Sequence, residues 1–391
     1  MEVLIIGKPT INVYLPLQEY PQEGDIFTIT GKNESLGGVG AVSACLLAKW
    51  GNKPYFTGVL GNDAYGEKIR NTFSEYKVNT KYLETTFEKG TTTNYFILNV
   101  KTGNVTKILY NDPNVELQKF KYDFQPDWAI MDGSDTAGAM ALLNNDGKVK
   151  TVFYARKADQ NTLALAKRCH YVVCSQAFVE VLTKSKISEE QATEEYVDMY
   201  QKLVDTVGSS NYIVLLNNKK ILYCEENKVK MLPEMKINHA DVSSFDSVFT
   251  GAFTYAMMNN ITLDESVKFA NTAAAISISK IGEEPSIPTL DEVLTNSGLK
   301  DRFKNTQVVN QPVEPSVQEQ VVVESAPQVQ TEASVSAFNQ QPVVNQAVEQ
   351  FVQEPVQEQV VQQAVQQVVQ QPPVQAEVVN QAPQPESNIF G

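Results

Sequence analysis

The residues best suited to chemistry lie in Asp241–Phe253, where a polar loop runs into an apolar helix. Ser243 stands three residues before Asp246, which is the spacing of a capping box, and apolar residues follow at helical spacing over Val248–Met257. A helix that begins this way directs several free backbone N–H groups at one point, which suits a bound anion. The stretch therefore resembles the place where a phosphoryl-transfer enzyme holds its transferring group.

These residues need elements to position them, and residues 1–300 supply short apolar strands that alternate with helical patterns. Such alternation predicts a mostly parallel sheet covered by helices on both faces. The helices expected near the chemistry are Ala41–Trp50, Val248–Met258 and Leu263–Ile278. Polar-alternating segments, including an expected strand at Ile26–Thr30 and a hairpin around Lys101–Asn104, would not survive inside that layered core. They predict a small separate β-sheet.

The charge and hydrophobicity of the chain limit its partners. Its 391 residues carry a formal net charge of −14, which argues against a nucleic-acid or anionic-membrane surface. The apolar segment Met1–Gly7 is too short for a signal peptide, and no apolar run approaches the roughly 20 residues of a membrane span. We therefore expect a cytoplasmic protein with no nucleic-acid or membrane partner.

The four cysteines, Cys45, Cys169, Cys174 and Cys224, leave a metal site open as an alternative. His170 follows Cys169 directly, but the chain has only 2 histidines and no second close pair of ligands. Buried, reduced thiols are the favoured interpretation.

The composition changes sharply near residue 300. After Lys304 the chain has no Lys or Arg and consists mainly of Gln, Val, Pro, Glu, Ala and Asn, which predicts a disordered tail over residues 301–391. A Val-Val-Asn-Gln motif recurs at Val308, Val343 and Val378. A drifting low-complexity segment is the favoured explanation. The alternative is a multivalent docking segment for an unknown protein partner.

Gly38–Ser43 has the form of a dinucleotide-binding fingerprint, but its position argues against that function. The fingerprint should follow the first strand directly and precede an acidic residue by about 20 positions. Here a hairpin is expected between the first strand and Gly38, and the chain contains no Gly-Lys-Ser or Gly-Lys-Thr. A Rossmann oxidoreductase is therefore disfavoured.

Several short motifs occur in an order and spacing that resemble the PfkB/ribokinase family of carbohydrate kinases over residues 1–300. The motifs that carry this resemblance are Pro21-x-x-Gly24-Asp25, Gly37-Gly38 before a helix, Gly61-Asn62-Asp63-x-x-Gly66, Thr91-Thr92-Thr93, Val248–Phe253, Asn271–Ala275 and Gly282 with Ile287-Pro288-Thr289. Each motif is weak alone, but their order along the chain is specific.

The resemblance implies a ribokinase-like three-layer α/β/α sandwich with a small β-sheet lid from about residues 12–36 and 91–111. It further implies ATP and Mg²⁺ as cofactors, a small sugar or nucleoside ligand, and a homodimer formed through the lid. In such an enzyme, a base takes the proton of the attacking hydroxyl while backbone N–H groups hold the phosphoryl charge.

Compared with the family motif, the base position falls on Ser247. A serine hydroxyl cannot serve as a general base at neutral pH. Asp246 is one residue early, so it could act only if the loop is rearranged, and a capping carboxylate is its favoured interpretation. The anion hole falls on Ser244, Phe245 and Asp246, where bulky Phe245 would crowd a phosphate. Asp241 falls on a position associated in the family with a monovalent cation.

Departures continue in the nucleotide and sugar motifs. The nucleotide-binding positions are Asn217, Lys220 and Asn271, and the usual glycines of the nucleotide loop are missing. The usual Asn-x-x-Glu element falls on Ser175–Phe178 without its carboxylate, and neighbouring Glu180 is expected to be a solvated helix residue.

The substrate-binding positions are Asn12, Gly37, Gly38 and Val42. Asn12 could still hydrogen-bond a hydroxyl, whereas Val42 could not.

These departures favour a PfkB-like protein that has lost most or all phosphotransfer and acts as a ligand sensor or scaffold. The principal alternative is an active, divergent carbohydrate kinase that uses Asp246 as its base. A third class is a structural protein that assembles through the lid and the tail.

Overall fold

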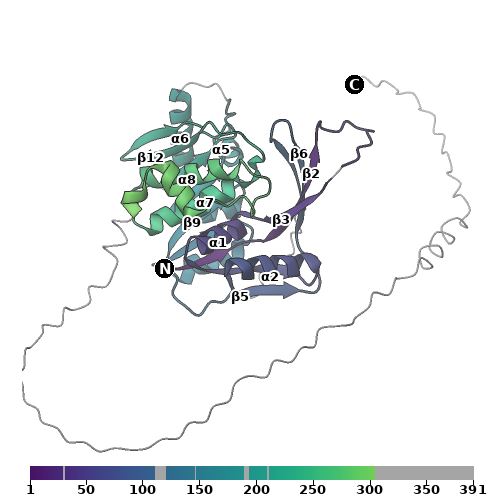
Figure 1. The fold of residues 1–391 in the computed structure, drawn as a ribbon. Helices are drawn as coiled ribbons and strands as arrows, with labels where there is room; N and C mark the ends of the chain where they lie inside the picture. Colours follow the sequence, from purple (N-terminus) through teal and green to yellow (C-terminus); the bar gives the residue numbers. More distant parts are fainter. Residues whose placement is uncertain (30, 111–119, 146, 189–192, 209–210, 304–391) are drawn as a thin grey trace, which may run out of the picture. The chain divides into compact units, whose positions relative to one another are not determined.

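The computed structural model describes residues 1–303, apart from residues 30, 111–119, 146, 189–192 and 209–210 (Figure 1). The chain divides into two units, Met1–Pro315 and Ser316–Gly391. The tail predicted for residues 301–391 lies almost wholly outside the described residues, so its predicted disorder and its docking motifs stay predictions.

The centre of the first unit is a mixed sheet that positions the opening stretch of helix. In sheet order its described strands are β13 (Lys228–Leu232), β12 (Ile221–Glu225), β11 (Asn211–Leu215), β10 (Tyr171–Ser175), β9 (Lys150–Ala155), β8 (Trp128–Met131), β1 (Glu2–Ile6), β4 (Lys53–Gly61) and β5 (Asn79–Thr86). The pairs from β11 to β5 are parallel, and β12 pairs antiparallel with both its neighbours. The prediction of a mostly parallel sheet is confirmed.

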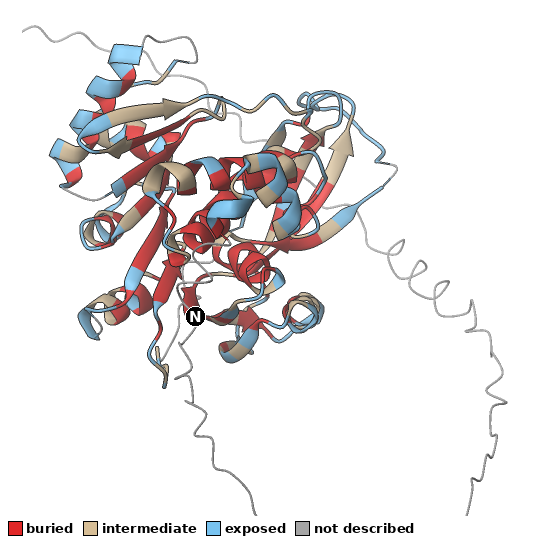
Figure 2. Cartoon of the chain, turned by 60° about the vertical axis from the view of Figure 1, so that its left-hand side comes forward, coloured by how far each residue is buried: buried red, intermediate tan, exposed pale blue. Residues whose placement is uncertain are grey.

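Helices cover both faces of this sheet, because successive strand side chains point to opposite faces. One core cluster joins strand residues such as Ile5 and Ile130 to helices α1 (Val39–Lys49), α2 (Ala64–Tyr76), α7 (Phe245–Met258), α8 (Leu263–Ser277) and α9 (Leu290–Ser297). The other cluster joins Leu4 and Met131 to helices α3 (Thr136–Asn145), α4 (Gln160–Ala166), α5 (Gln176–Thr183) and α6 (Thr193–Val207). Figure 2 shows the buried residues concentrated between these layers. The architecture is the expected three-layer α/β/α sandwich.

A second, four-stranded sheet confirms the predicted small separate β-sheet, which we call the lid. Its strands, in order, are β3 (Asn33–Gly37), β2 (Thr10–Leu17), β6 (Thr93–Asn99) and β7 (Val105–Leu109). The hairpin predicted around Lys101–Asn104 joins β6 to β7. The strand expected at Ile26–Thr30 is wrong for residues 26–29, and Thr30 is not described. Pairing with β2 begins only at Asn33, and Ile26 is 97% exposed, so its apolar side chain has no core to cover.

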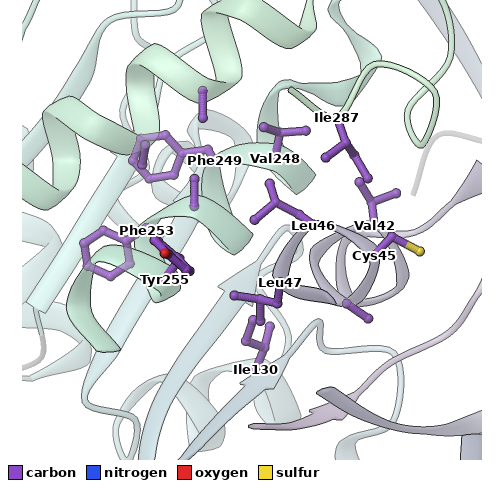
Figure 3. Packing of buried hydrophobic residues seen from close by; sticks show 14 of the residues in the cluster. Val42, Cys45, Leu46, Leu47, Ile130, Val248, Phe249, Phe253, Tyr255 and Ile287 are labelled. Carbon is purple, nitrogen blue, oxygen red and sulfur yellow. The ribbon is translucent and has the colours of Figure 1, made fainter. Parts of the chain in front are cut away.

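Helices α1 and α7 pack closely beneath the lid and fix the position of the opening stretch. A Cβ added at Gly251 of α7 would lie 3.1 Å from the Cα of Ser43 in α1, so glycine permits this close approach. Figure 3 shows Val42 and Leu46 of α1 in the same apolar cluster as Val248 and Phe249 of α7. This packing explains why the apolar pattern after Asp246 correctly predicted a helix.

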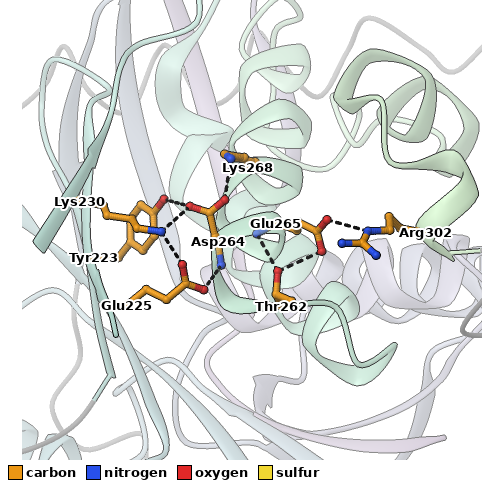
Figure 4. A network of polar contacts seen from close by, with 8 residues as sticks. All are labelled: Tyr223, Glu225, Lys230, Thr262, Asp264, Glu265, Lys268 and Arg302. Carbon is orange, nitrogen blue, oxygen red and sulfur yellow. Dashed lines mark hydrogen bonds and ion pairs between the residues drawn. The ribbon is translucent and has the colours of Figure 1, made fainter. Parts of the chain in front are cut away.

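Helix α8 is tied to its neighbours by a polar network (Figure 4). Asp264 accepts hydrogen bonds from Tyr223 at 2.6 Å and from Lys230 at 3.3 Å, so the β12–β13 hairpin is joined to the start of α8. On the other side, the Nε of Arg302 donates to Glu265 at 2.8 Å. Phe303 follows and is only 3% exposed, so the packed core continues to the end of the described segment.

The cysteines are free, and three of them are buried while Cys224 is partly exposed, which agrees with the predicted thiols. None of the helices in the described segments is long and apolar enough to cross a membrane.

Candidate active site

A cavity of about 520 Å³ lies where the lid faces the carboxyl ends of the central strands and the start of α7. Residues from all three parts line it, and those that bear on its chemistry are Lys8, Thr10, Asn12, Gly38, Thr92, Asn94, Lys107, Asp132, Tyr154, Arg156, Lys157, Asp159, Ser243, Asp246, Ser247 and Glu283. A cleft beyond the carboxyl ends of parallel strands is the usual ligand site of open α/β sheets.

The start of α7 is built differently from the predicted capping box. A single 3-10 turn, η1 (Val242–Ser244), precedes the helix, and Ser243 donates its hydroxyl to Asp241 at 2.8 Å instead of capping α7. The Phe245 N–H donates to the Val242 carbonyl. The Phe245 side chain is buried in the apolar core, so it does not crowd the cavity. The turn therefore uses one of the backbone donors that were predicted to form an anion hole.

Asp241, which was predicted as a cation ligand, has its carboxylate engaged by three protein donors. Its oxygens accept from the Ser243 N–H and hydroxyl, each at 2.8 Å, and from the Gly282 N–H at 2.9 Å. Among the described residues no group of three or more His, Cys, Asp or Glu side chains could hold a metal ion. The geometry gives Asp241 a positioning role, since it joins the turn before α7 to the loop that carries Glu283.

Ser247, at the predicted base position, lies in contact with a carboxylate that the sequence did not single out. Ser247 Oγ is 3.3 Å from Glu283 Oε2 and 3.1 Å from the Ser244 carbonyl oxygen. The other carboxylate oxygen of Glu283 accepts from Asn12 Nδ2 at 2.9 Å. A carboxylate thus stands between the lid and the start of α7, although position 247 is a serine.

The environment of Glu283 favours its neutral form. The pKa of Glu283 is raised to about 7, chiefly by burial. The charges of Asp241 and Asp246 contribute to this rise, whereas Lys107 and the hydrogen bond from Ser247 oppose it. The side chain is 6% exposed, so the loss of hydration is a sufficient cause. A carboxyl group with a pKa near neutrality can both accept and release a proton under ordinary conditions.

Asp246 also faces the cavity, and it does not cap its own helix as predicted. Its Oδ2 accepts from the Tyr154 hydroxyl at 2.5 Å, and Tyr154 comes from the end of β9. Burial, and then the Asp246 charge, raise the pKa of Tyr154 well above its usual value, so the phenol remains a proton donor. The bond fixes Asp246 toward the central sheet, because a helix start and a strand end meet there.

The lid side of the cavity is an amide and hydroxyl surface. Asn12 Oδ1 accepts from Thr10 Oγ1 at 3.0 Å and from Asn94 Nδ2 at 3.1 Å. Gly37 permits this arrangement, because a Cβ there would lie 1.9 Å from Asn12 Nδ2. At Gly38 the φ of +97° and the carbonyl oxygen of Lys8, 2.5 Å from an added Cβ, also require glycine. These groups suit the hydroxyls of a sugar.

Asp132 is a further carboxylate at the cavity that sequence reasoning missed. It accepts from the N–H groups of Lys8 at 3.1 Å, Gly40 at 3.3 Å and Ser134 at 3.0 Å. Burial raises its pKa above the ordinary value of an aspartate. It follows a buried strand directly, and that position was the available sequence signal, because ligand-binding side chains gather at strand ends.

The predicted nucleotide residues, Asn217, Lys220 and Asn271, are not among the residues that line the cavity. The Asn217 N–H donates to Gln176 Oε1 at 3.0 Å, and the ammonium of Lys220 lies 5.9 Å from the Tyr196 ring centroid. Asn271 is 3% exposed, and its Oδ1 has no hydrogen-bond partner in the described part of the chain. A buried acceptor without a donor is costly.

Glu180 differs from its predicted role as a solvated helix residue. Its side chain is 16% exposed and accepts from the Ile187 N–H and from Gln176, both at 3.0 Å.

The structure therefore brings together four of the predicted site residues, Asn12, Gly38, Asp246 and Ser247. Gly37 leaves room for the Asn12 side chain, and Asp241 holds the loop that carries Glu283. Val42 is fully buried in the core. Ser244 is also buried, and its hydroxyl is bonded to Ser277 at 2.8 Å. Sequence reasoning missed Glu283, although it follows the glycine of a motif that was recognised.

Comparison with known proteins agrees with this fold. Residues 2–290 match the family described as "pfkB family carbohydrate kinase". The ribokinase of Haemophilus influenzae is 26% identical over 305 residues, which cover 74% of this chain and 96% of that protein. The ribokinase of Cryptococcus neoformans in complex with ADP has a TM-score of 0.65 at 20% identity, over 75% of this chain and 99% of that one. The Arabidopsis thaliana ribokinase complexed with ribose and ATP has a TM-score of 0.58 at 19% identity, over 75% and 98%.

Proposed function

Because this chain belongs to the pfkB family of carbohydrate kinases, we propose that it transfers the γ-phosphoryl group of ATP to a hydroxyl of a sugar or nucleoside. The observation that carries the proposal is the cavity under the lid, whose polar lid side faces Asp246 and Ser247 at the start of α7. Amide and hydroxyl groups on one wall and acidic groups on the other are what a sugar hydroxyl needs to be held and activated.

On the sugar side, Asn12 and Asn94 of the lid orient the sugar hydroxyls. Asp132, at the end of a strand of the central sheet, accepts hydrogen bonds from these hydroxyls. Phe96 of β6 lines the same cavity and excludes water from the lid side. In the protein without ligand, Asn94 donates to Asn12 and Asp132 accepts from backbone N–H groups, so sugar binding exchanges internal hydrogen bonds for bonds of similar strength. Selectivity would then come from geometry more than from net hydrogen-bond energy.

On the nucleotide side, the cations Lys8, Lys107, Arg156 and Lys157 line the cavity of a chain whose net charge is −14. They fit the phosphates of ATP, which they would attract and orient. Asn271, a nucleotide position by the family resemblance, does not line this cavity, and its buried Oδ1 has no hydrogen-bond partner among the described residues. Mg²⁺ commonly binds through phosphates and water with one or two carboxylates, and Asp246 and Asp159 are two carboxylates of the cavity that would hold it beside the phosphates. When bound, the ion would neutralise phosphate charge.

Loss of phosphotransfer is the second candidate, and the missing glycines of the nucleotide loop favour it. Lys219 also favours this second candidate, because its side chain occupies space beside the start of α7. Its ammonium lies 5.4 Å from the Phe245 ring centroid and donates to the Asn217 carbonyl at 3.1 Å. The protein would then sense a sugar without phosphorylating it. We prefer the active kinase, because the cavity still contains carboxylates although position 247 is a serine.

The experiment that separates these candidates combines binding and turnover. Thermal stabilisation of the full chain would be measured with D-ribose, 2-deoxy-D-ribose and adenosine, each with and without ATP and Mg²⁺, followed by assays for ADP and phosphorylated product. An active kinase is stabilised by both ligands and forms product. A sensor is stabilised by the sugar alone. No stabilisation by any ligand would contradict both and favour an assembly role for the lid and the tail.

The proposal retains three further expectations from the sequence. The kinase domain corresponds to residues 1–300, residues 301–391 form an extension for a protein partner, and the lid is a candidate surface for a homodimer. Size-exclusion chromatography with light scattering on the full chain measures the last of these.

A further inference from the structure

Phosphoryl transfer to a hydroxyl requires a proton acceptor beside the attacking oxygen, at the start of α7. Ser247 occupies the matching position and cannot accept that proton at neutral pH. Two carboxylates of the cavity lie close by, Asp246 and Glu283. Only Glu283 is hydrogen-bonded to Ser247, and Asp246 is bonded to the Tyr154 hydroxyl from the direction of the sheet.

The two oxygens of Glu283 are held from opposite sides of the cavity. Asn12, on the lid, holds Oε1 at 2.9 Å, and Ser247, in the first turn of α7, lies 3.3 Å from Oε2. The loop that carries Glu283 is itself fixed, because the Gly282 N–H donates to Asp241 at 2.9 Å and Ser286 Oγ donates to the Glu283 carbonyl at 2.9 Å. The carboxyl group is therefore preorganised between the expected sugar and the expected phosphoryl group.

Resting on the proposed kinase function, we propose that Glu283 is the catalytic base, in the place that Ser247 leaves without a carboxylate. In this arrangement the acidic group comes from the loop that faces the start of α7, and its carboxylate lies 3.3 Å from Ser247 Oγ. Ser247 then acts as a positioning residue that holds Glu283, as Asn12 does from the lid.

The step balances with the groups that the proposed function names. The substrate O–H bond breaks and its proton passes to a carboxylate oxygen of Glu283, while the substrate oxygen forms a bond to the γ-phosphorus of ATP. The bond from that phosphorus to the bridging oxygen breaks, and its electron pair leaves with ADP. The proton on Glu283 then passes to water, which restores the carboxylate.

The surroundings of Glu283 set the pH at which it works. The groups that face it are Asn12 and Tyr14 of β2, Lys107 of β7, Asp241 before η1, and Asp246 and Ser247 of α7. Burial raises the pKa of the group to about 7. The turnover rate should therefore rise with pH through neutrality and level off once Glu283 is ionised.

The test is a pH profile of kcat for wild type and for Glu283→Gln, with whichever of D-ribose, 2-deoxy-D-ribose and adenosine wild type phosphorylates. Glutamine keeps an acceptor for Asn12 and removes the base. We expect kcat to fall at least 100-fold, a KM for the sugar within threefold of wild type, and loss of the limb near pH 7. Glu284→Gln, the same change one residue further on, should leave kcat and the limb unchanged.

Two variants at position 247 test the assignment of Glu283 as the base without relying on Glu283→Gln. In the double variant Ser247→Asp with Glu283→Ala, a carboxylate returns to the helix, and kcat should recover at least tenfold over Glu283→Ala. In Ser247→Asp alone, two carboxylates are in contact, so the limb should move to higher pH.

The outcomes separate the two proposals. If wild type turns over but Glu283→Gln keeps its kcat and its pH limb, or Asp246→Asn removes that limb instead, Glu283 is not the base and the kinase function stands. The assignment also fails if Ser247→Asp leaves the limb unmoved. Wild type without turnover on any of the three probes would overturn both the function and the base.

Discussion

Glu283 is held by groups from separate parts of the chain, and its ionisation is linked to the stability of the fold. In the folded protein its pKa is about 7, whereas its ordinary value is 4.5. Between these values the folded state binds more protons than the unfolded state, so its contribution to stability falls as pH rises. Ionisation of Glu283 does not lower the free energy of unfolding below pH 4.5, and it lowers that free energy by its full amount above pH 7.

Glu283→Gln should therefore stabilise the protein at high pH more than at low pH. We expect the free energy of unfolding of the variant, relative to wild type, to increase by about 2–3 kcal/mol from pH 5 to pH 8. Urea unfolding at the two pH values measures the difference. The control is Glu284→Gln, and an equal difference at both pH values would contradict the linkage.

Asn94 illustrates a polar residue whose effect passes through a neighbour. It donates to Asn12 Oδ1 at 3.1 Å and so orients the amide that faces Glu283. Asn94→Ala should weaken sugar binding about tenfold, which corresponds to the loss of roughly one hydrogen bond, while ATP binding is unchanged. Titration calorimetry with the sugar and, separately, with ATP measures the two affinities. Thr106→Ala, an exposed change in the same sheet, serves as the control.

At the scale of elements, the contact between α1 and α7 holds the start of α7 against the sheet. Gly251→Ala would place a Cβ 3.1 Å from the Cα of Ser43, and backbone atoms cannot move aside as a flexible side chain can. We expect a loss of about 1–3 kcal/mol in the free energy of unfolding. Chemical denaturation measures it against Gly147→Ala, where no heavy atom of the neighbouring described residues lies within 4 Å of the added Cβ. A loss below 0.5 kcal/mol would show that the two helices can separate at little cost.

The lid is the other element on which the site depends. Tyr14 of β2 lies 2.9 Å from Ser243 Oγ, hydroxyl to hydroxyl, so the lid is bonded to the turn that begins α7. Asn12 on the same strand reaches Glu283. One strand thus joins the expected sugar side to the expected phosphoryl side.

At the scale of the whole chain, the packed core of the described residues includes Phe303, whose ring lies 4.8 Å from that of Phe269 and 5.8 Å from that of Tyr255. A protein truncated to residues 1–304 should unfold within about 2 °C of the full chain, because it keeps this contact. Truncation to residues 1–298 removes Phe303 and the Arg302–Glu265 bond, and should lose at least about 3 kcal/mol. Thermal unfolding of the pair tests both. Equal stability of the two truncations would contradict a structural role for residues 299–303.

The sequence by itself determined the layered fold, the small separate sheet and the helix after Asp246, because hydrophobic periodicity and turn residues act locally. The resemblance of its motifs to the PfkB/ribokinase family also predicted Asn12, Gly38, Asp246 and Ser247 as residues of one site. The capping box failed, because the Ser243 hydroxyl bonds to Asp241, two residues before it, and also lies 2.9 Å from the Tyr14 hydroxyl of the lid. Sequence spacing does not reveal the contact with the lid.

Only the tertiary structure decided where the carboxylate at the start of α7 comes from. Glu283 is 36 positions after Ser247 in the chain, yet their side chains are 3.3 Å apart. Burial by the lid, the helix and its own loop gives Glu283 a pKa that no local pattern predicts. A motif comparison registers the loss of an acid at one position, whereas chemistry depends on where the acid stands in space.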